Sequence, residues 1–227
     1  MKVVETMNSR DKKSRGKIEE IKYDVAVQFL LPKHYAGRIP SISKAFGWYF
    51  NNELMAVCTF GKPASPSLCR GICGESCSAN VYELNRLCRV DEFTEPLSRF
   101  VSACLRRLRI ENWIIVSYSD TGMNHHGYIY QACNFIYTGQ TKERTDKWTP
   151  SGKHSRHYLN SEQSGFRKVR TSKHRYVYFC TFDKKLKRRW MDSLKYSVLD
   201  YPKGDNKNYV LGEYIKDKIV ISKATEC

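Results

Sequence analysis

Residues Ser117 to Phe135 read SYSDTGMNHHGYIYQACNF and pass from an apolar run, through a polar turn, into a short helix. The run WIIV at 113–116, directly ahead, predicts a strand that is buried on both faces. That strand ends at Asp120, and α/β sheets bind ligands outside the carboxyl ends of their strands. Tyr130 follows in the helix predicted around 128–133. The same pattern also fits a strand, a turn and a small capped helix in which neither Asp120 nor Tyr130 has a catalytic role.

The surrounding segments predict the rest of a layered fold. Residues 95–109, EPLSRFVSACLRRLR, place apolar side chains at helical spacing and arginines in the last turn, which indicates a helix. Residues 45–61, AFGWYFNNELMAVCTFG, indicate a hairpin that turns at Asn51 and Asn52. Residues 81–90 and 135–139 are predicted to be strands. Residues 62–80, rich in Pro, Gly and Ser, are predicted to be a long loop. This order predicts an α/β fold with a mixed sheet flanked by helices.

The 227-residue chain carries a formal net charge of +16 and a sequence pI near 9.5, so a polyanion is its natural partner. DNA or RNA fits this charge better than a membrane surface, because no segment resembles an amphipathic anchor. No apolar run reaches the roughly 18 residues of a membrane span, and the N-terminus lacks the apolar region of a signal peptide. Nine cysteines, an odd number, indicate reduced thiols. We therefore expect a soluble cytoplasmic protein with no membrane partner.

The composition divides the chain into a flexible basic tail at 1–20, a core at 21–140, and a basic extension at 141–227 packed on that core. Residues 141–175 hold ten Lys or Arg against three acidic residues, with aromatic residues between them. A strand and a helix beginning near Asp183 follow, and this helix buries one apolar stripe and exposes its cations. Cations that neutralise phosphates and rings that stack on bases predict nucleic-acid binding, although most charge runs are only solvated faces.

The candidate DNA contacts lie on these basic segments and in the turn-rich loop KHYAGRIPS at 33–41. We expect the strand and the helix of the extension to present their cations on one surface. The residues assigned to DNA binding are Arg38, Lys173, His174, Arg175, Lys187, Arg188 and Arg189.

From Tyr82 to Gly139 the pattern resembles the core of the GNAT acetyltransferases, with YELNRLCRV, SRFVSACLRRL, WIIVSYSD and IYQACNFIYTG matching its parts in order. The glycine-rich pyrophosphate loop of that family is missing, since VDEFTEPLS places acids there that would repel phosphates. A narrower resemblance is to the phage Mom family. It is carried by KHYAGRIPS, GKPASPSLCRGICG, ELNRL, SYSD and GYIYQACNFIYTG, and it spans about Lys33 to the C-terminal basic helix.

The Mom resemblance implies a GNAT-like catalytic core with a DNA-contacting extension. It implies an enzyme that converts adenine in phage DNA to N6-carbamoylmethyladenine and so protects the DNA from host restriction. The implied partner is double-stranded DNA with a flipped adenine, and the implied location is the host cytoplasm. The donor stays open between acyl-CoA and another acyl or glycyl donor, because the product carries an alkyl N–C bond rather than an amide. A homodimer is one option for the assembly.

Position by position, the resemblance implies catalytic roles for Tyr35, Asp120 and Tyr130 and cofactor contacts for Arg86 and Ser117. A phenol such as Tyr130 can protonate a departing thiolate and stays neutral at pH 7. Asp120 would assist the exocyclic amine of adenine, a poor nucleophile whose lone pair is delocalised into the ring. The candidate iron ligands, an imidazole, a phenolate and a carboxylate, are His34, Tyr35 and Asp120.

Two other functions stay open from the sequence. The first is a conventional acyl-CoA-dependent N-acetyltransferase that acts on an amine of a protein or small molecule, and the basic extension disfavours it. The second is a non-catalytic DNA-binding protein with a GNAT-like core, which the presence of Asp120 together with Tyr130 disfavours.

Overall fold

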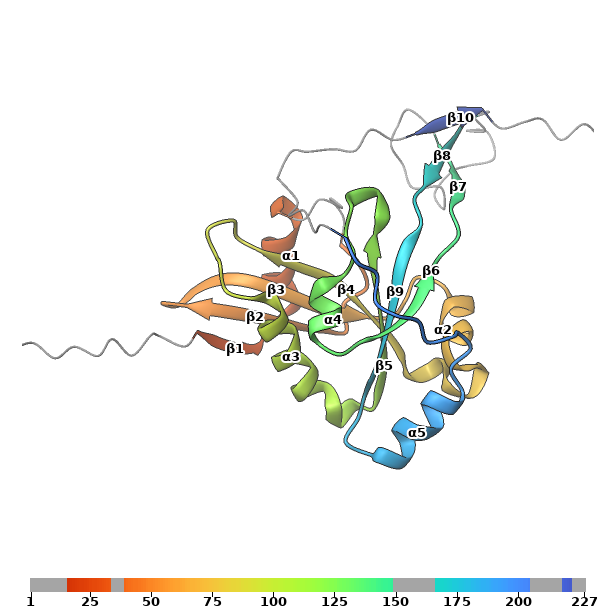
Figure 1. Cartoon of the computed structure of the whole chain (residues 1–227). Coiled ribbons are helices and arrows are strands. Elements are labelled where there is room, and N and C mark those ends of the chain that lie inside the picture. The colour runs from red at the N-terminus through yellow and green to blue at the C-terminus, as the bar shows by residue number, and fades with distance from the viewer. Residues whose placement is uncertain (1–15, 34–38, 149–165, 205–217, 222–227) are drawn as a thin grey trace, which may run out of the picture.

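The computed structural model describes residues 16–33, 39–148, 166–204 and 218–221. Within these ranges the chain forms a seven-stranded mixed sheet with helices on both faces, and a small three-stranded sheet projects from one end (Figure 1). The predicted fold class, an α/β fold with a mixed sheet flanked by helices, is confirmed. No helix in the described ranges is both long and apolar enough to cross a membrane.

The seven-stranded sheet has the order β1-β2-β3-β4-β5-β9-β6, and the small sheet has the order β10-β8-β7. The strands are β1 (Lys17–Glu20), β2 (Lys44–Phe50), β3 (Glu53–Gly61), β4 (Val81–Arg89), β5 (Trp113–Asp120), β6 (Ile136–Gln140), β7 (Arg144–Lys147), β8 (Phe166–Arg170), β9 (Lys173–Cys180) and β10 (Ile219–Ile221). The α-helices are α1 (Tyr23–Lys33), α2 (Pro66–Cys73), α3 (Leu97–Leu108), α4 (Tyr128–Ala132) and α5 (Lys184–Asp192). The 3-10 turns are η1 (Glu75–Asn80), η2 (Arg109–Glu111) and η3 (Thr121–Met123).

The parallel pair β4–β5 lies in the middle of a sheet whose other described pairings are antiparallel. Its register runs through Val81↔Ile114, Tyr82↔Ile115 and Glu83↔Val116, where it stops. β4 nevertheless continues to Arg89 along β3, and β5 continues to Asp120 along β9. The sheet is therefore split at the carboxyl ends of these two strands, and we call this opening the β4–β5 split.

Strand β9 lies between β5 and β6, although the sequence analysis assigned its residues to an extension packed on the core. It pairs with β5 along its whole length, from Asp120↔Lys173 to Trp113↔Cys180, and with β6 on its other side. Its side chains from His174 to Val177 are all buried. The central sheet is therefore incomplete without residues beyond position 140.

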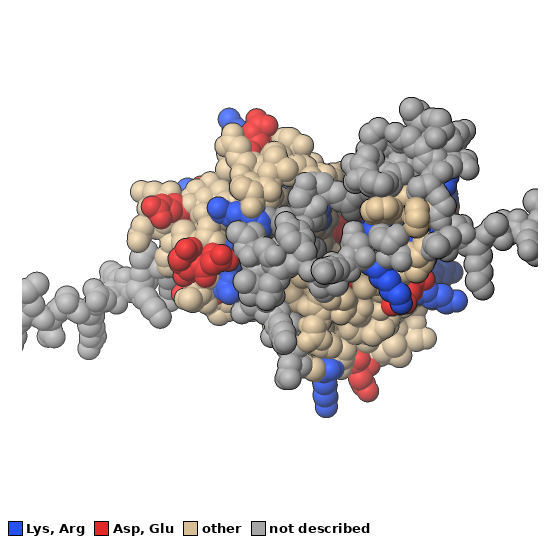
Figure 2. Space-filling view, turned by 90° about the horizontal axis from the view of Figure 1, so that it is seen from above, with Lys and Arg blue, Asp and Glu red and all other residues tan. Residues whose placement is uncertain are grey.

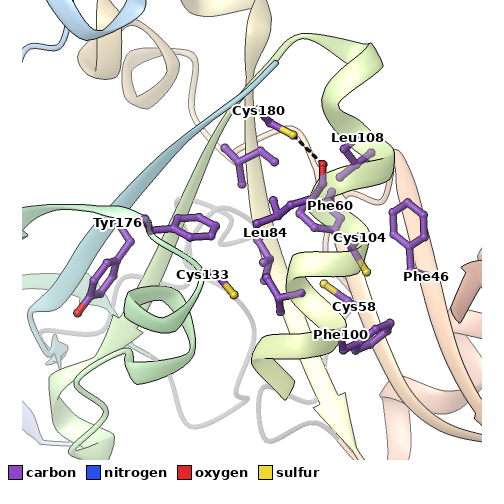
Figure 3. Close-up of a cluster of buried hydrophobic side chains, with 14 of the residues drawn as sticks. Phe46, Cys58, Phe60, Leu84, Phe100, Cys104, Leu108, Cys133, Tyr176 and Cys180 are labelled. Atoms are coloured by element: carbon purple, nitrogen blue, oxygen red, sulfur yellow. Dashed lines mark hydrogen bonds between the residues drawn. The ribbon is translucent and has the colours of Figure 1, made fainter. Parts of the chain in front are cut away.

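Helices cover both faces of the sheet, with α3 and α4 on one face and α1, α2 and α5 on the other (Figure 1). Neighbouring residues of β5 serve opposite faces: Ile115 packs with Phe100 of α3, whereas Ile114 packs with Trp190 of α5. This two-sided burial explains the unbroken apolar run of the strand. The larger core includes the thiols of Cys58 and Cys104 (Figure 3). Burial raises the pKa of Cys58 well above its usual value, so this thiol packs as a small apolar group.

Several predicted elements are confirmed. The hairpin of β2 and β3 turns at Asn51 and Asn52, whose φ values of 48° and 66° are those of the turn that matches the twist of the two strands. The predicted amphipathic helix is α3. The basic helix is α5, and its N-cap Asp183 accepts hydrogen bonds from the backbone N–H groups of Lys185 at 2.8 Å and Leu186 at 3.0 Å.

Two predictions of irregular structure are wrong. The segment 62–80 was expected to be a loop but forms α2 and η1, because Pro66 occupies the first turn, where its missing N–H costs nothing. α2 buries Cys69, Ile72 and Cys73 beneath it. Of the predicted tail at 1–20, residues 1–15 lie outside the described residues, and Lys17–Glu20 form strand β1, which is held by pairing with β2 rather than by its own hydrophobicity.

Candidate active site

The β4–β5 split contains both residues that were assigned to the cofactor. Ser117 follows Val116, the last residue of β5 that pairs with β4, and is fully buried. Its hydroxyl donates to the backbone oxygen of Leu84 at 3.0 Å. This bond fixes the point at which the two strands separate. Arg86 lies further along β4, where its guanidinium donates to the backbone oxygen of Asn85 at 2.7 Å. A ligand that enters the split would therefore meet Arg86 on the β4 side.

Glu83 marks the start of the split, because it is the last residue of β4 that pairs with β5. Its side chain is half-buried, and burial raises the pKa of its carboxyl, although the charges of Lys173 and Arg86 oppose this shift. The sequence analysis did not select Glu83. The available signal was strand alternation, which places this carboxylate on the same inward face as Val81, where acidic residues are rare.

Asp120 ends β5 and caps η3. Its Oδ1 accepts hydrogen bonds from the backbone N–H of Gly122 at 3.0 Å and from the hydroxyl of Thr171 at 2.5 Å. Its Oδ2 lies 3.5 Å from the ammonium nitrogen of Lys173, and 18% of the Asp120 side chain is exposed. The carboxylate therefore joins the end of β5 to the residues that connect β8 with β9.

The connection between β8 and β9 is also the base of the small sheet. Besides Asp120, Thr121 also holds this connection, because its hydroxyl donates a hydrogen bond to the backbone oxygen of Ser172 at 2.8 Å. We call β7 and β8 the basic arm. Its cations, set against the single acid Asp146, are Arg144, Lys147, Arg167, Lys168 and Arg170. Lys and Arg side chains are visible at this side of the molecule, on the right of Figure 2.

Tyr130 projects from α4 into a group of aromatic rings. Its ring centroid lies 5.3 Å from that of Tyr176 and 5.5 Å from that of Phe135. Gly127, at the start of α4, has a φ of +75°, and a Cβ there would lie 2.5 Å from the Tyr176 ring, so the chain passes Tyr176 closely only with glycine. Tyr130 packs on the α3 face, whereas strand alternation assigns Asp120 to the α2 face. The two residues approach the end of β5 from opposite sides of the sheet.

His174 and Arg175, both predicted to contact DNA, are buried, with exposed fractions of 3% and 9%. His174 Nδ1 lies 2.9 Å from the hydroxyl of Tyr137, and burial together with the nearby His126 lowers its pKa. Arg175 donates to the hydroxyl of Thr138 at 2.9 Å and to the backbone oxygen of the same residue at 2.8 Å. The expected surface fails here because β9 is a central strand, not part of an exposed extension.

The remaining predicted DNA contacts lie far apart. Lys173 begins β9 beside Asp120 and has 46% of its side chain exposed. Lys187, Arg188 and Arg189 are exposed on α5, which follows the other end of β9 (Figure 1). His34, Tyr35 and Arg38 lie outside the described residues. One common surface for the strand and the helix is therefore not formed.

A family model for the Mom protein family matches residues 15–203, which is most of the chain. The chain belongs to the Mom protein family. No curated protein matches it significantly. The matched range includes the β4–β5 split, Asp120, Tyr130 and the basic arm, so this arrangement is part of a Mom protein.

Solved acetyltransferases are similar in structure at low sequence identity. A GNAT family acetyltransferase from Elizabethkingia anophelis with acetyl-CoA bound is 11% identical, with a TM-score of 0.45 over 74% of this chain and 99% of that one. A Bacillus subtilis acetyltransferase in complex with CoA is 11% identical, with a TM-score of 0.44 over 72% and 98%. An N-acetyltransferase from Staphylococcus aureus is 9% identical, with a TM-score of 0.44 over 73% and 97%.

The iron ligands implied by the Mom resemblance receive no support from the described residues. Among these residues no group of three His, Cys, Asp or Glu side chains could hold a metal ion. Asp120 already faces the ammonium group of Lys173 and two hydrogen-bond donors. A carboxylate with a cation beside it does not fit a metal ligand in this arrangement. We therefore assign no chemical step to iron.

Proposed function

We propose that this Mom protein modifies adenine in double-stranded DNA at the exocyclic amine, forms N6-carbamoylmethyladenine, and protects phage DNA from host restriction in the host cytoplasm. The observation that carries the proposal is the family match over residues 15–203. The charge of +16 supports a polyanionic substrate.

The β4–β5 split supports an extended donor. Beyond Glu83 and Val116 the two strands no longer pair, so the ladder between them is open on that side, although the backbone oxygens of Leu84 and Asn85 already accept hydrogen bonds from Ser117 and Arg86. An extended chain with amide groups can add to such a strand edge through main-chain hydrogen bonds. Acyl-CoA has this form, and we propose an acyl-CoA or a related acyl or glycyl donor in the split beside Arg86.

The basic arm supports binding of duplex DNA close to the split. It is attached at Asp120 through Thr171, and its cations can neutralise phosphates without reading the sequence. Phe166 at the start of β8 is 45% exposed, and its ring would face DNA bound on the arm. Adenine must leave the stack to reach an enclosed reactive group, and stacking on aromatic side chains offsets part of that cost.

We assign three roles to the described residues. Tyr130 donates a proton to the leaving group, because a phenol is protonated at pH 7. Arg86 contacts the donor. Asp120 holds the basic arm and Lys173 in place at the end of β5. His34 and Tyr35 remain proposed active-site residues outside the described ranges.

The test is mass spectrometry of nucleosides from plasmid DNA after expression of the chain in bacteria, with Tyr130→Phe as the inactive control. We expect a deoxyadenosine heavier by a carbamoylmethyl group in the wild type and much less of it in the variant. Unmodified DNA together with newly acetylated protein would instead indicate a conventional acetyltransferase. Unmodified DNA that is still bound tightly would indicate a DNA-binding protein without catalysis.

A further inference from the structure

We infer that the corner of the molecule where η2 meets the start of α5 binds single-stranded DNA. The corner lies at the opposite end of β9 from the basic arm, on the order of 20 Å away at about 3.3 Å per strand residue. We call it the α5 corner, and it consists of the cations of α5 with Arg109, Ile110 and Phe182. It is a second nucleic-acid surface, and the choice of DNA as its occupant rests on the proposed function.

Two large apolar side chains of the α5 corner are exposed, although the backbone beside them is held in place. Phe182 is 69% exposed and Ile110 is 74% exposed. The hydroxyl of Thr181, the residue before Phe182, donates to Oδ1 of Asn112 at 2.5 Å, and Asn112 directly follows η2. This bond joins the end of β9 to the end of η2. Both apolar side chains are therefore presented to solvent from a fixed position.

The sequence of α5 explains why Phe182 is not buried. Phe182 stands directly before the N-cap Asp183, at the position whose apolar side chain often packs on the fourth residue of the helix. In α5 that fourth residue is Lys187, which offers the ring no apolar side chain to pack on. Instead, the guanidinium carbon of Arg109 lies 5.6 Å from the centroid of the Phe182 ring. The packing of α5 accounts for its outward cations but not for this exposed ring.

The cations of α5 follow Phe182 along the helix. All five are exposed, and no acidic side chain in the described part of the chain forms an ion pair with them. The carboxylate of Asp183 already accepts hydrogen bonds from two backbone N–H groups of the helix. The cations can therefore neutralise phosphates and release their counterions. They are Lys184, Lys185, Lys187, Arg188 and Arg189.

An exposed ring beside phosphate-binding cations fits a single strand better than a duplex. Inside a duplex each base is covered on both faces by its neighbours, whereas a single strand can place an unstacked base on an aromatic ring or a guanidinium plane. Phe182 and Arg109 supply both kinds of surface at one place. Since the proposed function makes DNA the substrate of this chain, we assign the α5 corner to single-stranded DNA.

The first experiment measures binding of a fluorescent oligothymidylate of about 12 nucleotides by anisotropy. This probe contains no adenine, so binding is measured without the modification reaction. Phe182→Ala should weaken binding by about 5- to 150-fold because the stacking of one base is lost, whereas Phe182→Trp should keep it. The control Tyr23→Ala, which removes an exposed ring at the start of α1, should bind like the wild type. Wild-type affinity in Phe182→Ala would overturn the proposal.

A second measurement separates the α5 corner from the basic arm. Changing Lys187, Arg188 and Arg189 to alanine should flatten the log–log salt dependence by up to about two units, near 0.7 per phosphate contact of a single strand. In a protein whose arm residues Arg144 and Lys147 are alanine, Phe182→Ala should weaken binding by the same factor as in the wild type, because distant sites act independently. Loss of the Phe182 effect in that background would place the probe on the arm and overturn the proposal.

Competition identifies the occupant. Unlabelled oligothymidylate should displace the probe at a lower concentration than oligouridylate of the same length or vesicles that contain phosphatidylserine. Stronger competition by oligouridylate would make the occupant RNA, and stronger competition by the vesicles would make the α5 corner a membrane surface, so either result would overturn the proposal. Unmodified adenine would contradict the proposed function alone, whereas binding that does not depend on Phe182 would contradict this inference alone.

Discussion

Two carboxylates on the neighbouring strands β4 and β5, Glu83 and Asp120, differ in what surrounds them. Asp120 is held by Gly122, Thr171 and Lys173, whereas Glu83 lies against the open side of the split. Hydrogen bonds and an ion pair fix the Asp120 side chain and commit its lone pairs, whereas burial raises the pKa of the Glu83 carboxyl against the charges of Lys173 and Arg86. The chemistry of each residue is thus set by its contacts and not by its type.

Replacing Asp120 with asparagine tests the positioning role. Asp120→Asn keeps an oxygen for Gly122 and Thr171 but loses the ion pair with Lys173, so the arm should shift relative to the split. Misplacement of about 1 Å can cost roughly 100-fold in rate. We expect the loss mainly as a higher KM for DNA, with the pH profile preserved, and no change in the control Asp192→Asn. A lower kcat with a lost pH dependence would instead make Asp120 the base.

The lowered pKa of His174 leads us to expect that the free energy of unfolding depends on pH. Its pKa in the folded protein is lowered, so the unfolded chain, with a histidine pKa of about 6.5, binds a proton more readily. Its contribution to stability is complete above that value and is lost as the pH falls below it. Denaturant unfolding between pH 7 and pH 5 should show a steeper loss for the wild type than for His174→Asn, by at most about 1.4 kcal/mol per pH unit. Equal slopes would contradict this.

At the scale of elements, the basic arm and α5 are separate candidates for DNA binding. β9 has the arm and Asp120 at one end and α5 at the other, and a strand rises about 3.3 Å per residue, so the two cationic surfaces are on the order of 20 Å apart. α5 buries Trp190 against Phe179 of the sheet, and this packing alone explains why its cations point outward. The arm is the surface next to the split.

The comparison uses two matched triple variants. In the first variant, Arg144 and Lys147 of the basic arm and Lys142, which lies just before β7, are changed to alanine. This should weaken duplex binding and flatten the log–log salt dependence by up to about three units, near 0.9 per phosphate contact. Changing Lys187, Arg188 and Arg189 to alanine should have a smaller effect. Binding is measured by fluorescence anisotropy over a range of salt concentrations. A larger effect of the second variant would move the DNA surface to α5.

At the scale of the whole molecule, the position of β9 makes the fold depend on both halves of the chain. Without β9, strands β5 and β6 would each expose an edge, and the buried side chains Tyr176, Val177 and Phe179 would be missing from the two cores. A fragment of residues 16–140 should therefore lack a cooperative thermal transition, whereas residues 16–204 should keep one. Circular dichroism during heating measures both. If the 16–140 fragment folds cooperatively, the core does not need β9, and the predicted boundary between core and extension at residue 140 is correct.

The sequence by itself determined the elements whose signal is local. The helical spacing in α3, the Asn51–Asn52 turn, the apolar run of β5 and the start of a helix near Asp183 each depend on neighbouring residues, so each was predictable. Motif order likewise predicted the Mom family, as well as Asp120 and Tyr130 as residues to examine.

Only the tertiary structure decided the features that depend on distant pairing. The sequence of a strand contains little information about which strands it will pair with. The insertion of β9 between β5 and β6 could therefore not be predicted from local pattern, and neither could the resulting burial of His174 and Arg175. The β4–β5 split arises because two strands stop pairing while others hold them, and this gave Glu83 its place. Sequence supplies side chains, whereas burial and charge, which fix their reactivity, come from contacts between residues far apart in the chain.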